Sequence, residues 1–280
     1  MGGALAIAFA PIFVRVSEAG PLSTAFWRLL LAWPALWVWT VMERRRRPDI
    51  RRPSRCTDYL RLAAAGLFFA GDLSVWHWSL RFTSVANSTL LVNYAPLWVT
   101  FAGWWLFQDR IEKPFLAGLV SALLGATLIV GASFQIRLEQ VKGDLLALTA
   151  SFFYAGYLLS ITRLRRDFST AAIMTWSTVG CTVILLAVTL LSGEKFFPGS
   201  PWGWLNLLGL ALISHIGGQG LITYALAHLP AAFSSVTLLL QPVFAAVLAW
   251  LLLAEALGAG QALGGLLVLV GIFLARKSAT

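Results

Sequence analysis

A gap-free repeat at a constant offset of 146 residues is the feature that most constrains how this chain can fold. The same or a chemically similar residue recurs at matched positions in the two halves, and the matched residues include proline, glycine, tryptophan and acidic types. Similar composition alone would not produce this agreement. We therefore interpret the pattern as an internal duplication, with a first repeat over residues 1–137 and a second over 138–280. The clearest matched pairs are Ser88 with Ser234, Pro96 with Pro242, Trp104 with Trp250, Asp109 with Glu255, Gly118 with Gly264 and Gly125 with Gly271.

The composition places most of the chain in lipid. Hydrophobic residues make up 59% of the 280 residues and charged residues only 12%, whereas a soluble domain carries about 25% charged residues. The net charge of +9 does not indicate nucleic-acid binding, because eight arginines gather between Arg44 and Arg61 and most other basic residues flank apolar runs. This distribution is typical of an orientation signal at a membrane surface.

Ten apolar stretches approach the length of about 20 residues that a membrane-spanning helix requires. We therefore expect an all-α membrane protein with ten transmembrane helices, five in each repeat. The expected spans are 1–16, 21–42, 59–81, 84–107, 114–134, 143–162, 169–192, 202–228, 230–253 and 258–275.

The distribution of lysine and arginine predicts the orientation of these spans. With both termini in the cytoplasm, 15 basic residues fall in cytoplasmic segments and 5 outside, and Arg28 lies within a span. This split favours that orientation. Because each repeat has an odd number of spans, the two repeats must be inverted relative to each other, about a pseudo-two-fold axis in the membrane plane. Such an architecture is typical of secondary transporters.

Arg28 and Asp72 are the charged residues well inside expected spans. They lie about seven and about ten residues from the outer ends of neighbouring spans, which at about 1.5 Å per residue corresponds to depths of roughly 10 and 15 Å. Their side chains are therefore close enough in depth to meet. Either they form a structural ion pair, or Asp72 takes up a proton or an amino group during transport.

Helix breaks are expected near the middle of two spans, at Pro96 and its counterpart Pro242. Proline removes a backbone hydrogen bond and frees a carbonyl one turn back, although a packing kink is the alternative reading. We expect a substrate site at the repeat axis, between the first, third, fourth, sixth, eighth and ninth spans. Gln219 lies at similar depth, and Tyr154 and Tyr157 face this space if they point inward. The candidate polar contacts are Tyr94, Gln241 and His215, and the candidate walls are Trp78, Trp98 and Trp176.

No sequence pattern indicates a cofactor or a metal site. The three histidines lack metal-ligand spacing, and the chain has no glycine-rich phosphate loop. Apart from Arg28, no lysine or arginine lies deep in a span, which disfavours a phosphorylated substrate. Cys56 and Cys181 lie in opposite environments, so we expect no disulfide.

Several motifs resemble those of the EamA family of the drug/metabolite transporter superfamily, and the likeness covers nearly the whole chain. Two positions depart from the family: Asp109 stands where a glutamate is usual, and the first helix lacks a Trp-Gly start. Within the family, the Trp-rich sequence looks most like the YddG-type aromatic amino-acid exporters of bacterial inner membranes. The resemblance implies ten helices and efflux of small metabolites. The motifs are Phe26-Trp27-Arg28 with Ala32, the corner Ser79 to Ser84, and Gln241-Pro242-Val243-Phe244 followed by Glu255, Gly264 and Gly271.

We therefore expect a secondary transporter of the bacterial inner membrane, not an enzyme, that exports small neutral or zwitterionic metabolites, foremost aromatic amino acids, by alternating access. The alternatives are an exporter of other amino acids or cationic drugs, an intramembrane hydrolase built on Ser214 and His215, and a non-transporting scaffold. Neighbouring helical residues point about 100° apart, which disfavours the hydrolase.

The glycine pairs at seven-residue spacing indicate close helix packing, either within the chain or against a second copy. We accordingly expect a monomer or a weak homodimer, whose partners are its small-molecule substrate and membrane lipid. The pairs are Gly118 with Gly125, and Gly264 with Gly271.

The charge distribution predicts opposite labelling of two cysteines. In a Cys56→Ser background, Gly199→Cys should react with an impermeant thiol reagent from the periplasmic side. In the natural chain, Cys56 should react only after the membrane has been opened, and Cys181 should stay silent within its apolar run. The reverse labelling pattern would contradict the expected orientation.

Overall fold

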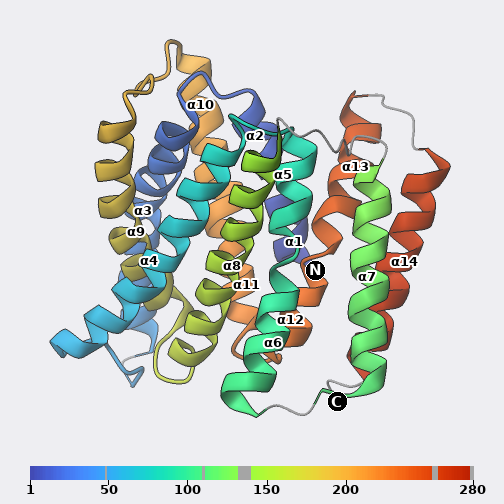
Figure 1. Cartoon of the computed structure of the whole chain (residues 1–280). Coiled ribbons are helices and arrows are strands. Elements are labelled where there is room, and N and C mark those ends of the chain that lie inside the picture. The colour runs from blue at the N-terminus through green and yellow to red at the C-terminus, as the bar shows by residue number, and fades with distance from the viewer. Residues whose placement is uncertain (48, 109–110, 132–139, 254–257, 278–280) are drawn as a thin grey trace.

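The computed structural model describes residues 1–47, 49–108, 111–131, 140–253 and 258–277, and this part of the chain is a helical bundle without strands (Figure 1). The helices of the first half are α1 (Gly2–Ala8), α2 (Ala10–Arg15), α3 (Pro21–Arg46), α4 (Cys56–Ser79), α5 (Val85–Val92), α6 (Ala95–Phe107) and α7 (Lys113–Gly131). Those of the second half are α8 (Val141–Leu164), α9 (Thr170–Ser192), α10 (Pro201–Gly209), the π-helix η2 (Leu210–Gln219), α11 (Gly220–Ala225), α12 (Ala231–Thr237), α13 (Leu240–Leu253) and α14 (Ala259–Lys277).

Each expected span overlaps at least one of these helices. Seven helical stretches of the described residues are long and apolar enough to cross a membrane by length and composition. The expected all-α membrane fold is therefore confirmed, while the number of ten crossings stays a prediction. Asp109, Glu255 and the expected repeat boundary between residues 137 and 138 lie outside the described residues.

Both expected helix breaks are present. The first separates α5 from α6 at Asn93 and Tyr94, just before Pro96, and the second separates α12 from α13 at Leu238 and Leu239. The second half has a further irregularity that the sequence does not predict, because η2 interrupts the helix between α10 and α11. Insertions of this kind are frequent at functional sites.

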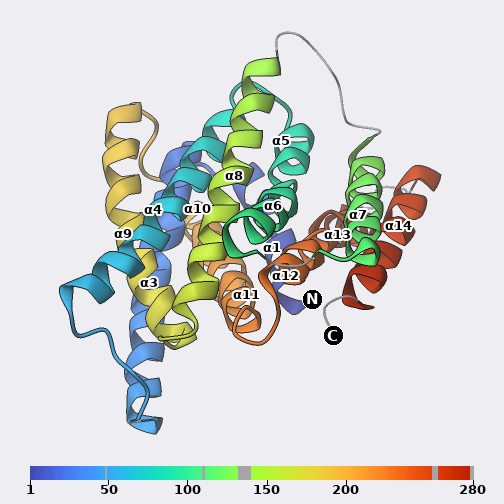
Figure 2. The ribbon, with the colours of Figure 1, turned by 60° about the horizontal axis from the view of Figure 1, so that its bottom comes forward.

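Helices α7 and α14 run antiparallel and side by side in both views (Figures 1 and 2). Two glycine contacts allow their backbones to touch: a Cβ on Gly118 would lie 2.5 Å from the carbonyl oxygen of Gly271, and a Cβ on Gly125 would lie 2.5 Å from that of Gly264. Because Gly118 matches Gly264 and Gly125 matches Gly271, each contact is the two-fold image of the other. The glycines therefore pack within the chain.

A hydrogen bond between two matched positions marks where the axis passes. Ser121 Oγ donates to the carbonyl oxygen of Leu267 at 2.9 Å, and these residues are 146 apart in sequence. Residues related by a two-fold rotation touch each other only when they lie beside the rotation axis. The axis therefore crosses the interface of α7 and α14.

The connections divide between the two ends of the bundle (Figure 1). The segment after α3, the α8–α9 connection and the end of α14 lie at one end, and the α2–α3, α4–α5 and α9–α10 connections lie at the other. Helix α3 continues to Arg46, past its expected end at residue 42, so part of the predicted basic loop is helical. Arginines in the last turn stabilise such an extension, because they interact favourably with the negative end of the helix dipole.

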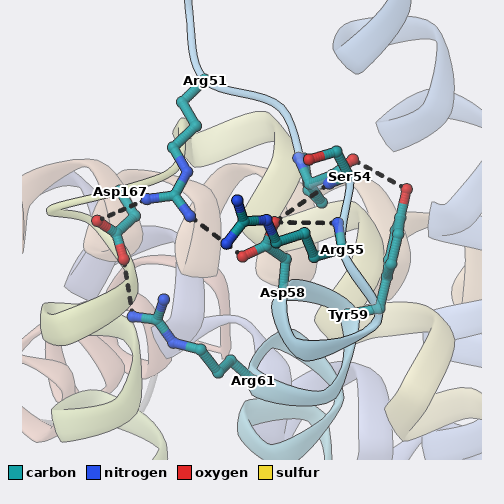
Figure 3. A network of polar contacts seen from close by, with 8 residues as sticks. Arg51, Ser54, Arg55, Asp58, Tyr59, Arg61 and Asp167 are labelled. Atoms are coloured by element: carbon teal, nitrogen blue, oxygen red, sulfur yellow. Dashed lines mark hydrogen bonds and ion pairs between the residues drawn. The ribbon is translucent and has the colours of Figure 1, made fainter.

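Ion pairs connect the loop before α4 to the α8–α9 corner (Figure 3). Asp58 accepts hydrogen bonds from the backbone N–H groups of Ser54 and Arg55, and these bonds, with Arg51, hold the pKa of its carboxyl below the usual range. Arg51 also pairs with Asp167 at 3.2 Å. This loop is therefore tied to the second half of the chain.

Carboxylates order the loops at the opposite end. Glu18 accepts hydrogen bonds from Ser200 Oγ at 2.5 Å and from the backbone N–H of Gly199 at 2.8 Å, which lowers the pKa of its carboxyl. Glu194 pairs with Arg81. Each contact joins a loop of the first half to the α9–α10 connection.

The packing of α7 against α14 predicts that Gly271→Ala destabilises the protein. The new methyl group would lie 2.5 Å from the carbonyl oxygen of Gly118 and 2.6 Å from the backbone nitrogen of Ala122. Overpacking of this kind costs about 1–3 kcal/mol, which should lower the Tm by roughly 5 °C. The matched control is Gly260→Ala on the same helix, where nothing lies within 4 Å of the added Cβ. Equal Tm values for the two variants in thermal unfolding would refute the contact.

Candidate functional site

A cavity of about 90 Å³ lies among the helices that meet at the two breaks. All six spans expected to form a site contribute to its wall, through α1, α2, α4, α5, α6, α8, η2 and α13, and α3 adds Arg28. The polar lining residues are Arg28, Asp72, Thr89, Asn93, Gln219 and Gln241, and the aromatic ones are Phe69, Trp76 and Tyr154.

Residues at matched positions of the two repeats lie together in and beside the wall of the cavity. Phe69 and His215, which are matched positions, stack on each other with ring centroids 5.7 Å apart and an interplanar angle of 19°. This second contact between matched residues places the axis beside the cavity, as the hydrogen bond of Ser121 does at the α7–α14 interface. Five matched pairs line the cavity: Ala8 with Tyr154, Leu73 with Gln219, Val92 with Leu238, Ala95 with Gln241, and Pro96 with Pro242.

The two helix breaks differ in their hydrogen bonding. Val92 and Leu238, each four residues before a proline, both line the cavity. The carbonyl oxygen of Leu238 accepts a hydrogen bond from the backbone N–H of Gln241 at 2.8 Å. The expectation of a free carbonyl is therefore wrong at the second break, because the tight turn into α13 supplies a replacement donor for the N–H that Pro242 lacks.

Arg28 and Asp72 line the same cavity without forming a close ion pair. They are 3% and 6% exposed, and among the described residues the ion pairs within 4.0 Å include neither side chain. Arg28 Nε and Asp72 Oδ1 are buried without a hydrogen-bond partner in the described structure. The guanidinium carbon of Arg28 lies 6.0 Å from the ring centroid of Phe69. The structure thus places the guanidinium group and the carboxyl group in one space, each with one buried atom that has no hydrogen-bond partner among the described residues.

Three further lining residues carry a buried polar atom that has no partner within the described structure. They provide two donors, Trp76 Nε1 and the hydroxyl of Thr89, and one acceptor, Gln219 Oε1. Buried polar atoms in folded proteins are nearly always hydrogen-bonded, so each exception requires an explanation. Together with Arg28 and Asp72, these atoms give the cavity the means to bind a guest with both acidic and basic groups.

An aromatic stack forms the wall next to these charges. Phe69 lies against Tyr157, with centroids 4.5 Å apart, and Tyr157 lies against Tyr154 at 6.1 Å. The hydroxyl of Tyr154 accepts a hydrogen bond from Gln219 Nε2 at 3.5 Å. Tyr157 is 1% exposed and lies behind the wall, whereas Phe69 and Tyr154 face the cavity.

The predicted polar residues divide between the cavity and the surrounding packing. Gln241, like Arg28 and Asp72, lines the cavity. The Tyr94 hydroxyl instead forms a hydrogen bond with Thr127 Oγ1 at 3.1 Å, and His215 Nε2 forms one with Thr178 Oγ1 at 2.9 Å. Neither Tyr94 nor His215 lines the cavity, although His215 supports it through Phe69.

The three predicted tryptophan walls lie elsewhere. Trp78 is 49% exposed on the outer face of α4. Trp98 Nε1 donates to Ser151 Oγ at 2.8 Å, and Trp176 packs edge-on against Tyr59 with centroids 4.8 Å apart. Trp76 lines the cavity in place of Trp78. The two residues are two positions apart on α4, which corresponds to a rotation of about 200°, so their side chains lie on opposite faces of the helix.

The helical period around Asp72 is the signal that would have found the wall. Phe69, Leu73 and Trp76 lie three residues before, one after and four after Asp72, so one face of α4 carries all four side chains into the cavity. The described residues contain no group of three His, Cys, Asp or Glu side chains that could hold a metal ion.

The sequence profile of the EamA-like transporter family matches residues 1–131 and again residues 141–276. An uncharacterized transporter of Archaeoglobus fulgidus is 25% identical over 94% of this chain and 91% of its own length. A probable amino-acid metabolite efflux pump of Salmonella typhimurium is 26% identical over 95% and 89% of the two chains. A pseudopaline exporter of Pseudomonas aeruginosa is 26% identical over 75% and 72%.

A solved crystal structure serves as an example of the same fold. It superposes with a TM-score of 0.81 and 18% sequence identity, and the match covers 99% of this chain and 95% of that chain. At this identity the likeness concerns the fold alone.

The shared cavity predicts that the charges of Arg28 and Asp72 stabilise each other. Arg28→Gln and Asp72→Asn should each lower the Tm, because each leaves a buried charge without its counter-charge. The double variant should be more stable than the sum of the single effects predicts, by about 1–3 kcal/mol. Thermal unfolding of the four proteins in detergent gives this coupling. Strictly additive effects would show that the two charges do not interact.

Proposed function

The chain belongs to the EamA-like transporter family, and on this basis we propose that it exports zwitterionic amino acids with aromatic side chains. The family makes it a multi-pass membrane protein that transports small molecules and is not an enzyme. The proposal adds the substrate class, the inner membrane as its location, both termini in the cytoplasm, and alternating access between two inverted repeats.

The observation that carries the substrate class is the presence of an acidic and a basic side chain in one cavity, each with a buried atom that lacks a partner among the described residues. A zwitterion presents an ammonium group and a carboxylate on one carbon atom. Asp72 Oδ1 suits the ammonium group and Arg28 Nε suits the carboxylate, since both atoms are buried and lack other partners among the described residues. Charge-assisted hydrogen bonds of this kind are stronger than neutral ones.

The aromatic wall supports an aromatic side chain on the substrate. Phe69, Trp76 and Tyr154 line the cavity beside the two charges. A ring that stacks on one of them gains about 0.5–1.5 kcal/mol beyond the burial of apolar area. An amino acid with a flat, apolar side chain thus matches both parts of the lining.

The position of the cavity supports alternating access. A site that opens alternately to the two sides of a membrane must be lined by both repeats. Here five matched pairs of residues from the two halves line the cavity, and so do residues at both helix breaks. A relative movement of the halves about the axis would therefore change access on both sides while keeping the lining residues together.

The named relatives favour an amino-acid-like substrate. The Salmonella protein is described as a probable efflux pump for amino-acid metabolites, and the Pseudomonas protein as an exporter of pseudopaline. At 26% identity these names indicate the general class of cargo. The choice of aromatic amino acids rests on the lining of the cavity.

The alternatives have less support. A cationic drug without a carboxylate would place its positive charge beside that of Arg28. Other amino acids have a carboxylate for Arg28 and avoid this repulsion. The hydrolase would need Ser214 and His215 to act together, but Ser214 Oγ donates to the carbonyl oxygen of Ala6 at 3.3 Å, while His215 binds Thr178. A non-transporting scaffold would leave the partnerless polar atoms of the cavity without a role.

A pair of tryptophans on α4 tests the site. In proteoliposomes that exchange labelled phenylalanine by counterflow, Trp76→Ala should weaken phenylalanine binding by roughly threefold to tenfold, because it removes one stacking partner. Trp78→Ala is the matched control, since Trp78 faces away from the cavity, and should keep wild-type exchange. Normal exchange in both variants would exclude the cavity as the site.

A substrate panel tests the class. Asp72→Asn should reduce phenylalanine exchange about tenfold or more through the loss of a polar partner for the ammonium group, while a cooperative unfolding transition in circular dichroism, at the lowered Tm expected above, would show that the variant is folded. If wild-type vesicles carry threonine or a cationic dye but not phenylalanine, the aromatic assignment is wrong and the transporter assignment remains.

A further inference from the structure

A second and larger hollow lies at the arginine-rich end of the bundle, away from the central cavity. It measures about 790 Å³ and lies between the last turns of α3, the α8–α9 connection and Tyr224 of α11. We define the basic groove by five arginines in its lining, which are Arg46, Arg47, Arg51, Arg165 and Arg166. No residue of the basic groove lines the central cavity.

The basic groove has an excess of positive charge, because its lining contains five arginines but two carboxylates, of which Asp167 is already paired. Asp167 accepts from Arg51 at 3.2 Å and from Arg61 at 2.8 Å, and Glu43 accepts a hydrogen bond from Ser169 Oγ at 2.5 Å. Figure 3 shows the two arginines on either side of the Asp167 carboxylate. The groove therefore keeps unneutralised arginines that face its hollow.

The remaining arginines have donors to spare. Among the described residues, Arg46, Arg47 and Arg166 make no ion pair, and the buried Nε of Arg165 has no hydrogen-bond partner. Arg165 also donates from Nη1 to the carbonyl oxygen of Phe168 at 2.6 Å, which fixes the position of its guanidinium. Guanidinium groups of this arrangement suit the oxygens of a phosphate.

The floor of the basic groove is apolar and leads back along α3 into the membrane-spanning part of that helix. Ala35, Val38, Met42 and Arg46 follow one another at spacings of three or four residues, so they form one stripe along the helix. Val38 and Met42 are 55% and 47% exposed. One face of α3 thus changes from apolar to basic where the membrane surface is expected.

We propose that the basic groove binds an anionic phospholipid, with its phosphate among Arg46, Arg165 and Arg166 and an acyl chain along the stripe of Ala35, Val38 and Met42. The charge of the arginines matches the headgroup, and the apolar floor matches the chain. A soluble phosphate compound would use the arginines but leave the floor exposed. The occupant is therefore a lipid of the leaflet that faces the arginine-rich end.

The test uses the full-length protein and native mass spectrometry. Phosphatidylglycerol should bind to the wild-type protein more tightly than phosphatidylcholine with the same acyl chains. Each arginine near an anionic lipid contributes roughly fivefold in affinity, so Arg46→Gln with Arg166→Gln should weaken phosphatidylglycerol binding about 25-fold. The matched control is Arg45→Gln with Arg276→Gln, which removes the same charge from exposed positions outside the groove and should change binding little.

Three outcomes would overturn the proposal. Equal binding of the two lipids to the wild-type protein would exclude selection by charge, and this comparison needs no variant to fold. An equal loss in the control variant would indicate a diffuse surface effect. Binding of glycerol phosphate as tight as that of the lipid would make the occupant a soluble phosphate compound. Thermal unfolding in phosphatidylcholine should show that both double variants remain folded.

Discussion

Close approach of helix backbones is the constraint on which the rest of this structure depends. Lipid tails are as apolar as the side chains they surround, so helices in a membrane associate through tight packing of small residues and through hydrogen bonds. Gly118, Gly125, Gly264 and Gly271 let α7 and α14 touch along their backbones. The axis that relates the two halves passes through the resulting interface. It also passes beside the stack of Phe69 and His215. The cavity therefore lies next to this axis.

The polar lining of the cavity is costly in a fold of this kind. A buried charge destabilises a protein unless another charge or a set of hydrogen bonds compensates it. Arg28 and Asp72 compensate each other only in part, since the described structure leaves one buried atom of each without a hydrogen-bond partner. A fold selected for stability alone would place apolar side chains at these positions. The retained charges therefore favour a role in ligand binding.

Depth along the membrane could be predicted from the sequence, whereas rotation about each helix could not. The offset of 146 and the lengths of the apolar runs locate both breaks and the six expected spans that line the cavity, but not the contribution of α3 through Arg28. Arg28, Asp72 and Gln241 are recognisable because polar groups avoid lipid. Tryptophan gives no such signal, since it occurs in cores, cavities and membrane interfaces alike, and only the helical period separates Trp76 from Trp78. The π-helix η2 and the hydrogen bond of Gln241 to Leu238 depend on tertiary packing, which single-chain periodicity does not encode.

The two helix breaks are matched in sequence but not in structure, and this inequality has an energetic consequence. If the halves were identical, an exchange of their conformations would turn an inward-open protein into an outward-open one of equal free energy. Here the second break has a satisfied carbonyl, and among the described residues the π-helix occurs in the second half and has no counterpart in the first. Under the alternating access proposed above, these differences would remove the degeneracy and favour one orientation, by tenfold in population for each 1.4 kcal/mol. Such a bias would be a property of the empty protein, and it would set the side of the membrane from which a substrate first reaches the site.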